Sequence, residues 1–342
     1  MKFMYSKKIK FILMVVLTMS LLLNGCGSKT TPPEPQQPAQ TNEQSNEGKN
    51  TETAFPEKPI TMIVPWSAGG GTDLIFRKLS DVMSKDIGQP IVVMNVEGGG
   101  GQVGFQQINA SAADGYTVGV ITNSMLLQKI TQGTKLGAQD FTVLSMVNYD
   151  AAALTVNAES PYNSVAEFVE AAKANPGKLR VGNSGAKAIW HITAMLMEKE
   201  TGIQVTHVPY EGANPAAVAV AGGHIEAVTV SAGEVKGLVE GGKLKMLGLM
   251  SDERSKTFPD VPTFKEEGID LQFGVWRALV APKGIPADVV AKLEASVQKA
   301  VEGEDFKKFM ADNEFGIYFK PAAEAQEFIT NEETTLKDVI GE

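Results

Sequence analysis

Two glycine-rich segments follow short apolar runs and have the composition of an anion site. Residues 69–73 read Gly-Gly-Gly-Thr-Asp after the run 60–65, and residues 98–104 follow the run 91–96. A glycine-rich turn between a strand and a helix exposes backbone N–H groups and a helix N-terminus, which bind small anions such as carboxylates. The alternative is that these glycines only let a helix pack close to a strand.

Nucleotide binding is a poor interpretation of the same glycines. Gly99, Gly101 and Gly104 have the spacing G-x-G-x-x-G, but a dinucleotide site also needs an acidic residue at the end of the next strand. Residues 119–126 cover that end and contain no acid. Segment 69–73 lacks the Gly-Lys-Ser/Thr of a P-loop. We therefore expect no cofactor.

Signatures of catalysis are weak. The chain has no G-x-S-x-G and no H-E-x-x-H motif. Ser184 and His191 could meet, but no acid is marked to orient such a pair, and His191 is interpreted as a helix-start residue that orients a loop. One Cys and three scattered His also argue against a metal site. We predict that the protein is not an enzyme.

Alternating strand and helix patterns must position the glycine loops. Strands are expected at 60–65, 91–96, 116–122, 179–183, 204–208, 225–230 and 244–250. Helices are expected after Thr72 or Asp73, which are placed to cap the first one, around 108–112, and at 164–174, 188–200, 213–221, 233–240, 286–302 and 322–338. Strands separated by helices indicate βαβ units in two mostly parallel sheets.

Composition limits the class of protein. The 342 residues carry a formal net charge of −9, which argues against a nucleic-acid partner. With 43% hydrophobic residues, the chain can form a core, and its length allows two domains.

The N-terminus resembles an export signal. Residues 1–25 contain four lysines and no acid, and the segment 11–23 is largely apolar. Leu23-Asn24-Gly25-Cys26 resembles a bacterial lipobox, which predicts cleavage before Cys26 and its acylation; a plain secretory signal with an incidental Cys is the alternative. Cleavage would change the net charge from −9 to −13. Residues 26–55, rich in Pro and polar residues, are expected to be a disordered tether that holds a soluble body at the membrane.

An ordered set of short segments resembles the substrate receptors of tripartite tricarboxylate transporters, also called the Bug family. The segments are Pro56-Glu57-Lys58-Pro59-Ile60, Val64-Pro65, Gly69-Gly70-Gly71-Thr72-Asp73, Gly88-Gln89-Pro90, Val92-Val93, Asp114-Gly115-Tyr116-Thr117, Val208-Pro209-Tyr210-Glu211-Gly212, Gly241-Gly242-Lys243-Leu244-Lys245, Pro259-Asp260-Val261-Pro262-Thr263 and Glu267-Gly268. The resemblance implies an α/β periplasmic-binding-protein fold of type II, with two lobes, a hinge and an interlobe cleft. We expect lobe 1 at 56–150 plus 275–342 and lobe 2 at 151–274, with crossings near 146–156 and 273–282.

The resemblance also implies where a ligand carboxylate would lie. One wall is the first strand-to-helix loop of lobe 1, where Asp73 caps the helix and does not contact ligand; the other is the loop before a lobe 2 helix. The expected ligand-binding residues are Trp66, Ser67, Gly70, Gly71, Thr72, Thr122, Asn123, Ser184, Lys187, Tyr210, Ser231, Trp276 and Arg277. The family often has Gly-Ser where this chain has Lys187-Ala188.

Two cations are candidates for recognising a multiply charged acid. Arg277 lies in an apolar stretch, and its planar fork can hold a carboxylate; the alternative is an ion pair with a lobe 2 acid. Lys187 adds a charge to a loop that the family places on the ligand; the alternative is a surface lysine. The functional hypothesis predicts that Arg277→Ala weakens binding of a di- or tricarboxylate.

The function that the resemblance implies is a lipid-anchored, extracytoplasmic receptor on the cell membrane. It would bind a tri- or dicarboxylate such as citrate as a monomer and deliver it to integral-membrane permease subunits. A carboxylate sensor for a signalling partner and an enzyme that acts on a carboxylate are the alternatives.

Overall fold

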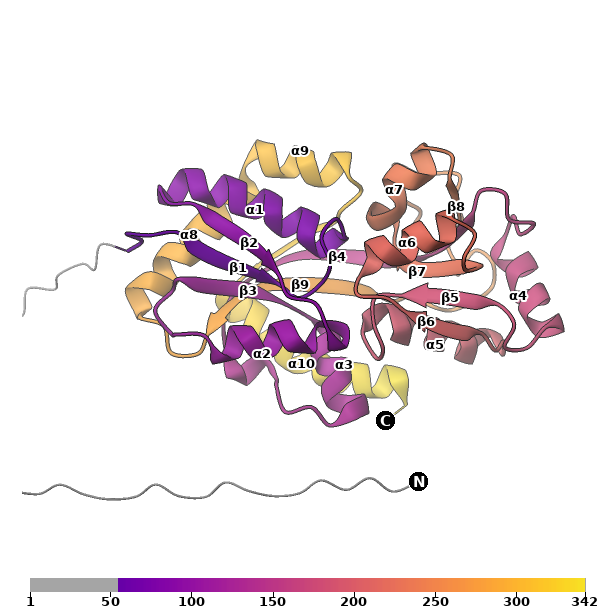
Figure 1. The fold of residues 1–342 in the computed structure, drawn as a ribbon, viewed down its shortest axis with the longest axis horizontal. Helices are drawn as coiled ribbons and strands as arrows, with labels where there is room; N and C mark the ends of the chain where they lie inside the picture. The colour runs from indigo at the N-terminus through magenta and orange to yellow at the C-terminus, as the bar shows by residue number, and fades with distance from the viewer. Residues whose placement is uncertain (1–54, 342) are drawn as a thin grey trace, which may run out of the picture. The chain divides into compact units, whose positions relative to one another are not determined.

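The structure, a computed structural model, describes residues 55–341. Its strands are β1 Ile60–Val64, β2 Ile91–Asn95, β3 Thr117–Thr122, β4 Phe141–Asn157, β5 Arg180–Asn183, β6 Thr206–Pro209, β7 Ala227–Ser231, β8 Leu244–Met250, β9 Gly274–Pro282 and β10 Ile317–Pro321. Its α-helices are α1 Gly71–Ile87, α2 Gln102–Ala110, α3 Asn123–Gln132, α4 Val165–Ala174, α5 Ile189–Thr201, α6 Ala213–Ala221, α7 Ala232–Glu240, α8 Ala287–Glu302, α9 Glu304–Asp312 and α10 Ala322–Ile340. Figure 1 shows their arrangement.

The long strand β4 joins two groups of strands in a sheet of order β2-β1-β3-β9-β4-β7-β5-β6, with β8 and β10 also paired to β4. Up to Ala151, β4 pairs with β9; from Ala152 it pairs with β7 and β8. β1, β2 and β3 are parallel to one another, as are β5, β6 and β7, whereas every pairing of β4 and β9 is antiparallel. The expectation of mostly parallel sheets was therefore wrong, because the chain crosses between the groups in β4 and returns beside it in β9.

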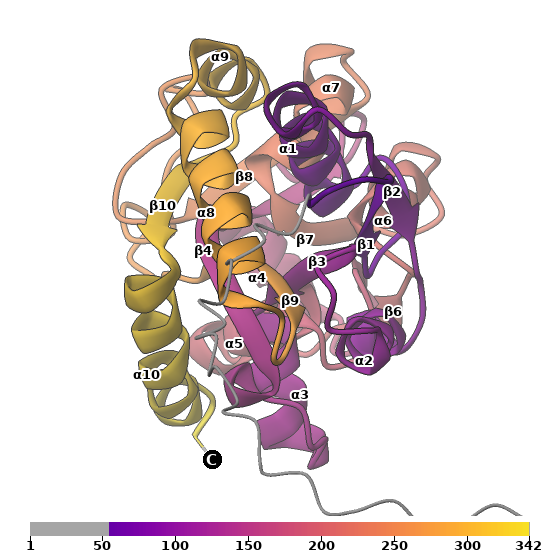
Figure 2. The same cartoon turned by 90° about the vertical axis from the view of Figure 1, so that its left-hand side faces the viewer.

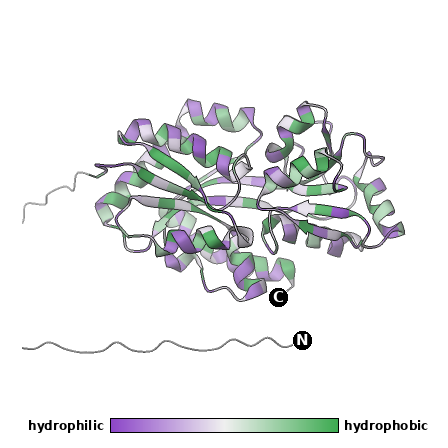
Figure 3. Cartoon of the chain, in the orientation of Figure 1, coloured by the Kyte–Doolittle hydropathy of each residue, from purple (hydrophilic) through white to green (hydrophobic). Residues whose placement is uncertain are grey.

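Helices cover both faces of the first strand group. Alternate residues of β1 belong to different cores: Ile60, Met62 and Val64 pack with α1, α8 and α9, and Ile63 packs with α2 and α3. Figure 2 shows α1, α8 and α9 on one side of this group and α2, α3 and α10 on the other. Because successive side chains of a strand point to opposite faces, a strand buried on both faces is apolar throughout. In Figure 3 the central strands are accordingly the greenest part of this group.

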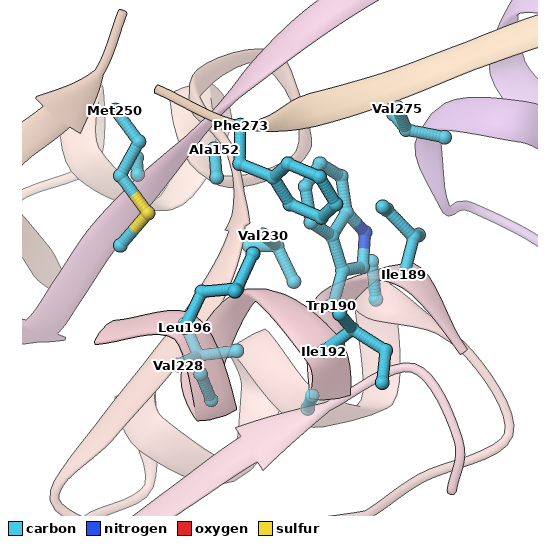
Figure 4. Close-up of a cluster of buried hydrophobic side chains, with 14 of the residues drawn as sticks. Ala152, Ile189, Trp190, Ile192, Leu196, Val228, Val230, Met250, Phe273 and Val275 are labelled. Atoms are coloured by element: carbon cyan, nitrogen blue, oxygen red, sulfur yellow. The ribbon is translucent and has the colours of Figure 1, made fainter. Parts of the chain in front are cut away.

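The second strand group has a core built around α5. Figure 4 shows the Trp190 ring from α5 near Phe273 and Val275. All three side chains are buried. The Phe273 carbonyl accepts a hydrogen bond from the Ala152 N–H, and the Phe273 N–H donates to the Met250 carbonyl, where β4 changes partners. An apolar core therefore lies directly beside the crossing of the chain.

The expected elements are present within two residues at each end, except that the helix expected around 108–112 begins at Gln102, and five elements were not expected. The sequence analysis did not predict α3, α9 or β10, and it placed crossings near 146–156 and 273–282 without predicting the strands β4 and β9 there. Phe55, expected in the tether, is buried and packs its ring on Tyr116 at 5.1 Å. The signal segment, Cys26 and the tether up to residue 54 lie outside the described residues. From Phe55 onward, no helix has the length and apolarity needed to cross a membrane.

Candidate functional site

The loop between β1 and α1 is held from several directions. Asp73 accepts a hydrogen bond from the Gly69 N–H at 3.0 Å and pairs with Arg77. Asn95, at the end of β2, donates to the Trp66 carbonyl and to Asp73. Burial alone would raise the pKa of Asp73, but the hydrogen bonds from Arg77, Gly69 and Asn95 outweigh it and lower that pKa. The ionised Asp73 therefore holds the loop in its conformation through these hydrogen bonds.

A small cavity of about 20 Å³ lies where this loop meets the second strand group. Its walls come from the β1–α1 loop, the end of β3, the starts of α5, α6 and α7, and β9. The lining residues are Trp66, Ser67, Gly70, Gly71, Thr72, Asp73, Thr122, Ser184, Ile189, Trp190, Ala213, Glu234, Val275 and Arg277. The volume suffices for about one water molecule.

Donors gather around this cavity. Gly71 is the first residue of α1, where backbone N–H groups and the positive end of the helix dipole favour an anion. Trp66 Nε1 and Ser67 Oγ are buried, and no group among residues 55–341 pairs with either atom. Buried polar atoms normally have a hydrogen-bond partner. The arrangement therefore suits a ligand that accepts hydrogen bonds.

Arg277 lies at one wall within a network of protein groups. Its guanidinium is 1% exposed and pairs with Asp150 at 2.5 Å and with Glu234 at 3.3 Å. It also donates to Thr72 Oγ1 at 2.9 Å and to Asn148 Oδ1. This is the ion pair that the sequence analysis kept as an alternative, because Glu234 falls within the residues expected for lobe 2. Neither Thr72 nor Asp73 caps α1 as expected, because the N-cap is Gly70 without a side-chain hydrogen bond, and the Thr72 hydroxyl accepts from Arg277.

Eight of the thirteen predicted binding residues line the cavity: Trp66, Ser67, Gly70, Gly71, Thr72, Thr122, Ser184 and Arg277. The other five, Asn123, Lys187, Tyr210, Ser231 and Trp276, do not. Trp276 cannot share a face with Arg277, because neighbours on a strand point to opposite sides. Its ring lies against Phe328 of α10 instead, at 6.3 Å.

The four other residues lie outside the lining, and Ser231 Oγ is buried without a hydrogen-bond partner among residues 55–341. The Asn123 amide donates to the Gly274 carbonyl at 2.8 Å. Lys187 Nζ lies 3.7 Å from the Met195 sulfur, along α5. Tyr210 is half-buried, and the Ser231 N–H donates to Glu234.

His191 is the helix-start residue that the sequence suggested. Its Nδ1 accepts a hydrogen bond from the Lys187 N–H at 2.8 Å. Burial, with smaller contributions from His207 and Lys187, lowers the pKa of His191 to about 4. The imidazole is therefore neutral near pH 7, and it holds the loop before α5.

Sequence reasoning omitted several lining residues. Ala213, Ile189 and Val275 offer only apolar surface or backbone, and no motif marks such positions or that of Trp190. Val275 could have been found from Arg277, since residues two apart on a strand share a face. Glu234 was not among the expected binding residues; its position three residues after Ser231, at a helix start, is the signal that could have been used.

Comparisons with known proteins agree on one family. The model of the tripartite tricarboxylate transporter family receptor matches residues 75–342. The structure of the periplasmic binding protein BugD is 26% identical with a TM-score of 0.79, over 84% of this chain and 99% of BugD. MatC from Rhodopseudomonas palustris with bound malate is 27% identical with a TM-score of 0.78, over 84% of this chain and 100% of MatC. R. palustris Rpa4515 with adipate is 25% identical with a TM-score of 0.79, over 83% of this chain and 97% of that protein.

These matches confirm the expected α/β fold of periplasmic binding proteins. The family is one of solute-binding transport receptors and not of enzymes. The chain belongs to the receptor family of tripartite tricarboxylate transporters.

Proposed function

We propose that this receptor binds a small organic dicarboxylate in the cavity between the two strand groups and delivers it to membrane permease subunits. The observation that carries the proposal is the set of buried donors at the cavity: Trp66 Nε1 and Ser67 Oγ lack partners among residues 55–341, and Gly71 begins α1 beside them. Oxyanions are the natural acceptors for such donors. The malate and adipate in the related structures are both small dicarboxylates.

The local charge favours a dicarboxylate over the tricarboxylate that the family name suggests. Arg277 is already paired with Asp150 and Glu234, so this cluster of two carboxylates and one guanidinium is net negative when ionised. Lys187 lies outside the cavity lining. A third ligand carboxylate would meet no unpaired cation in the lining, so citrate should bind more weakly than malate or adipate.

Binding requires the cavity to open. A space of about 20 Å³ cannot hold malate. We propose that residues 56–150 plus 275–342 move as lobe 1, that 151–274 move as lobe 2, and that β4 and β9 bend between them at the point where β4 changes partners.

A ligand screen tests the function. The protein beginning at Thr53 should show a rise in Tm with malate or adipate, a smaller rise with citrate, and none with the uncharged diamide of succinic acid. Calorimetry should then give a Kd in the micromolar range or below, with one site per chain. A full panel of di- and tricarboxylates that leaves Tm unchanged would contradict the proposal.

The anchor belongs to the same proposal and rests on residues 1–26 alone. Acylated Cys26 would hold the receptor at the extracytoplasmic face, next to the permease. Radiolabelled palmitate should enter the wild-type protein and not the Cys26→Ser variant; equal labelling of both would contradict the lipid anchor.

A further inference from the structure

Glu234 places a carboxylate of the protein against the groups that suit a ligand carboxylate. The residue lies in the first turn of α7, directly after β7. Its Oε1 accepts a hydrogen bond from the Gly71 N–H at 3.2 Å and lies 3.3 Å from Arg277 Nη2. Its Oε2 accepts from the Ser231 N–H at 2.9 Å, and the side chain is 4% exposed.

These contacts reach across the cavity. Gly71 belongs to α1 of the first strand group, whereas Glu234 belongs to α7 of the second. A helix N-terminal N–H together with a guanidinium is a typical pair of partners for a carboxylate. The Glu234 carboxylate already contacts both the Gly71 N–H and Arg277, and it comes from the opposite wall of the cavity.

The fit leaves no room for a second carboxylate beside the first. A Cβ added at Gly71 would lie 2.8 Å from Glu234 Oε1 and 2.9 Å from Arg277 Nη2. A ligand oxygen at the Gly71 N–H would therefore collide with Glu234 unless Glu234 withdrew. Withdrawal is possible because α7 lies in the part of the chain proposed to move as lobe 2.

We propose that Glu234 is an internal competitor: its carboxylate occupies the anion position of the closed cleft until a ligand carboxylate replaces it. The inference rests on the proposed function and names a residue that sets its selectivity. Opening carries Glu234 away from Gly71 and Arg277, and the incoming acid takes over both partners. An acid binds only if it interacts with these groups better than Glu234 does, which selects against weakly binding monocarboxylates.

Removing Glu234 should change the ligand affinity in the direction opposite to that expected for a merely structural acid. A structural acid that is removed weakens the site, whereas a competitor that is removed strengthens it. Glu234→Gln keeps the shape of the side chain and removes its charge, so the amide competes less well for Arg277. Neutral hydrogen bonds are weaker than charge-assisted ones by enough to change a binding constant about tenfold.

The test is calorimetry of L-malate and adipate binding to the full-length protein in detergent. Glu234→Gln should lower the Kd about tenfold, and Glu234→Asp, which keeps the charge on a shorter side chain, should lower it by a smaller factor. Glu240→Gln, at the exposed end of the same helix, makes the same change in net charge and should leave the Kd unchanged. Asp150→Asn removes the other carboxylate of Arg277 without releasing the Gly71 N–H, so it should lower the Kd less than Glu234→Gln does.

The outcomes separate the two proposals. If wild type binds either acid and both Glu234 variants, folded by circular dichroism, bind it equally or more weakly, the competitor is overturned and the receptor function stands. If Asp150→Asn tightens binding as much as Glu234→Gln, the effect is one of charge alone and the competitor is also overturned. If no variant binds any acid, the proposed function fails and the inference fails with it.

Discussion

At the scale of single residues, the two cations singled out from the sequence have different roles. Arg277 joins the cavity to two buried carboxylates, so its charge is used inside the protein. Lys187 has a backbone φ of 59°, in the left-handed region that favours glycine. This conformation would suit the glycine that the family resemblance leads one to expect at this position. The turn before α5 therefore does not explain why this chain has a lysine at position 187, and no contact among residues 55–341 gives its charge a ligand role.

The role of Arg277 should be tested first through the free energy of unfolding. Arg277→Met leaves Asp150 and Glu234 buried without their cation, and breaking such a pair costs about 3–5 kcal/mol in free energy of unfolding. Urea unfolding near pH 7 would measure it. Adding Asp150→Asn and Glu234→Gln to Arg277→Met should recover most of the loss, because no uncompensated charge is then left. A loss below about 1 kcal/mol in Arg277→Met would contradict the network.

At the scale of elements, hydrophobic periodicity located most strands and helices. Two of the elements that it missed, α3 and β10, have identifiable causes. α3 begins at Asn123 directly after β3 ends at Thr122, so no polar loop separates the two patterns; only the Thr122 hydroxyl, which accepts the Ser124 N–H, marks the boundary. β10 is exposed or half-exposed along its length and therefore lacks an apolar alternation.

The candidate site was predictable where it depends on loops and less so where it depends on side-chain direction. The β1–α1 loop could be recognised from its glycines, and all the binding residues predicted there line the cavity. Trp276 and Arg277 were assigned to the same cleft, although adjacent strand residues face opposite ways. The Glu234–Gly71 contact joins residues 163 positions apart. A pairing of that kind depends on how two strand groups close on each other, which local sequence patterns do not encode.

At the scale of the whole folded body, residues 55–341 hold the cleft closed through direct contacts between its walls. The Ser67 N–H donates to the Glu211 carbonyl at 3.0 Å, and the Asn214 amide donates to the Ala68 carbonyl at 3.3 Å. The Ile189 N–H donates to Ser124 Oγ at 3.0 Å. Each contact would have to break for an acid to enter. In the proposed mechanism, a ligand held from both walls would then favour a form in which the walls close on the ligand and not on Glu234.

Gly212 allows the walls to approach this closely, and a larger residue there should keep the cleft open. It precedes α6 with extended backbone (φ 161°), so a side chain would meet no backbone strain. A Cβ at this position would lie 2.2 Å from Ser67 Oγ and 3.2 Å from the Ser67 nitrogen.

Gly212→Val should therefore increase the radius of gyration measured by small-angle scattering and weaken malate binding about tenfold or more, since interactions from both walls are lost together. Gly237→Val, on α7 with no atom within 4 Å of a Cβ, is the matched control and should behave as wild type. If Gly212→Val and Gly237→Val differ in this way, contact between the two walls is needed for the acid to be held. A Gly212→Val protein with the wild-type radius of gyration and the wild-type affinity would show that the two walls do not need to meet.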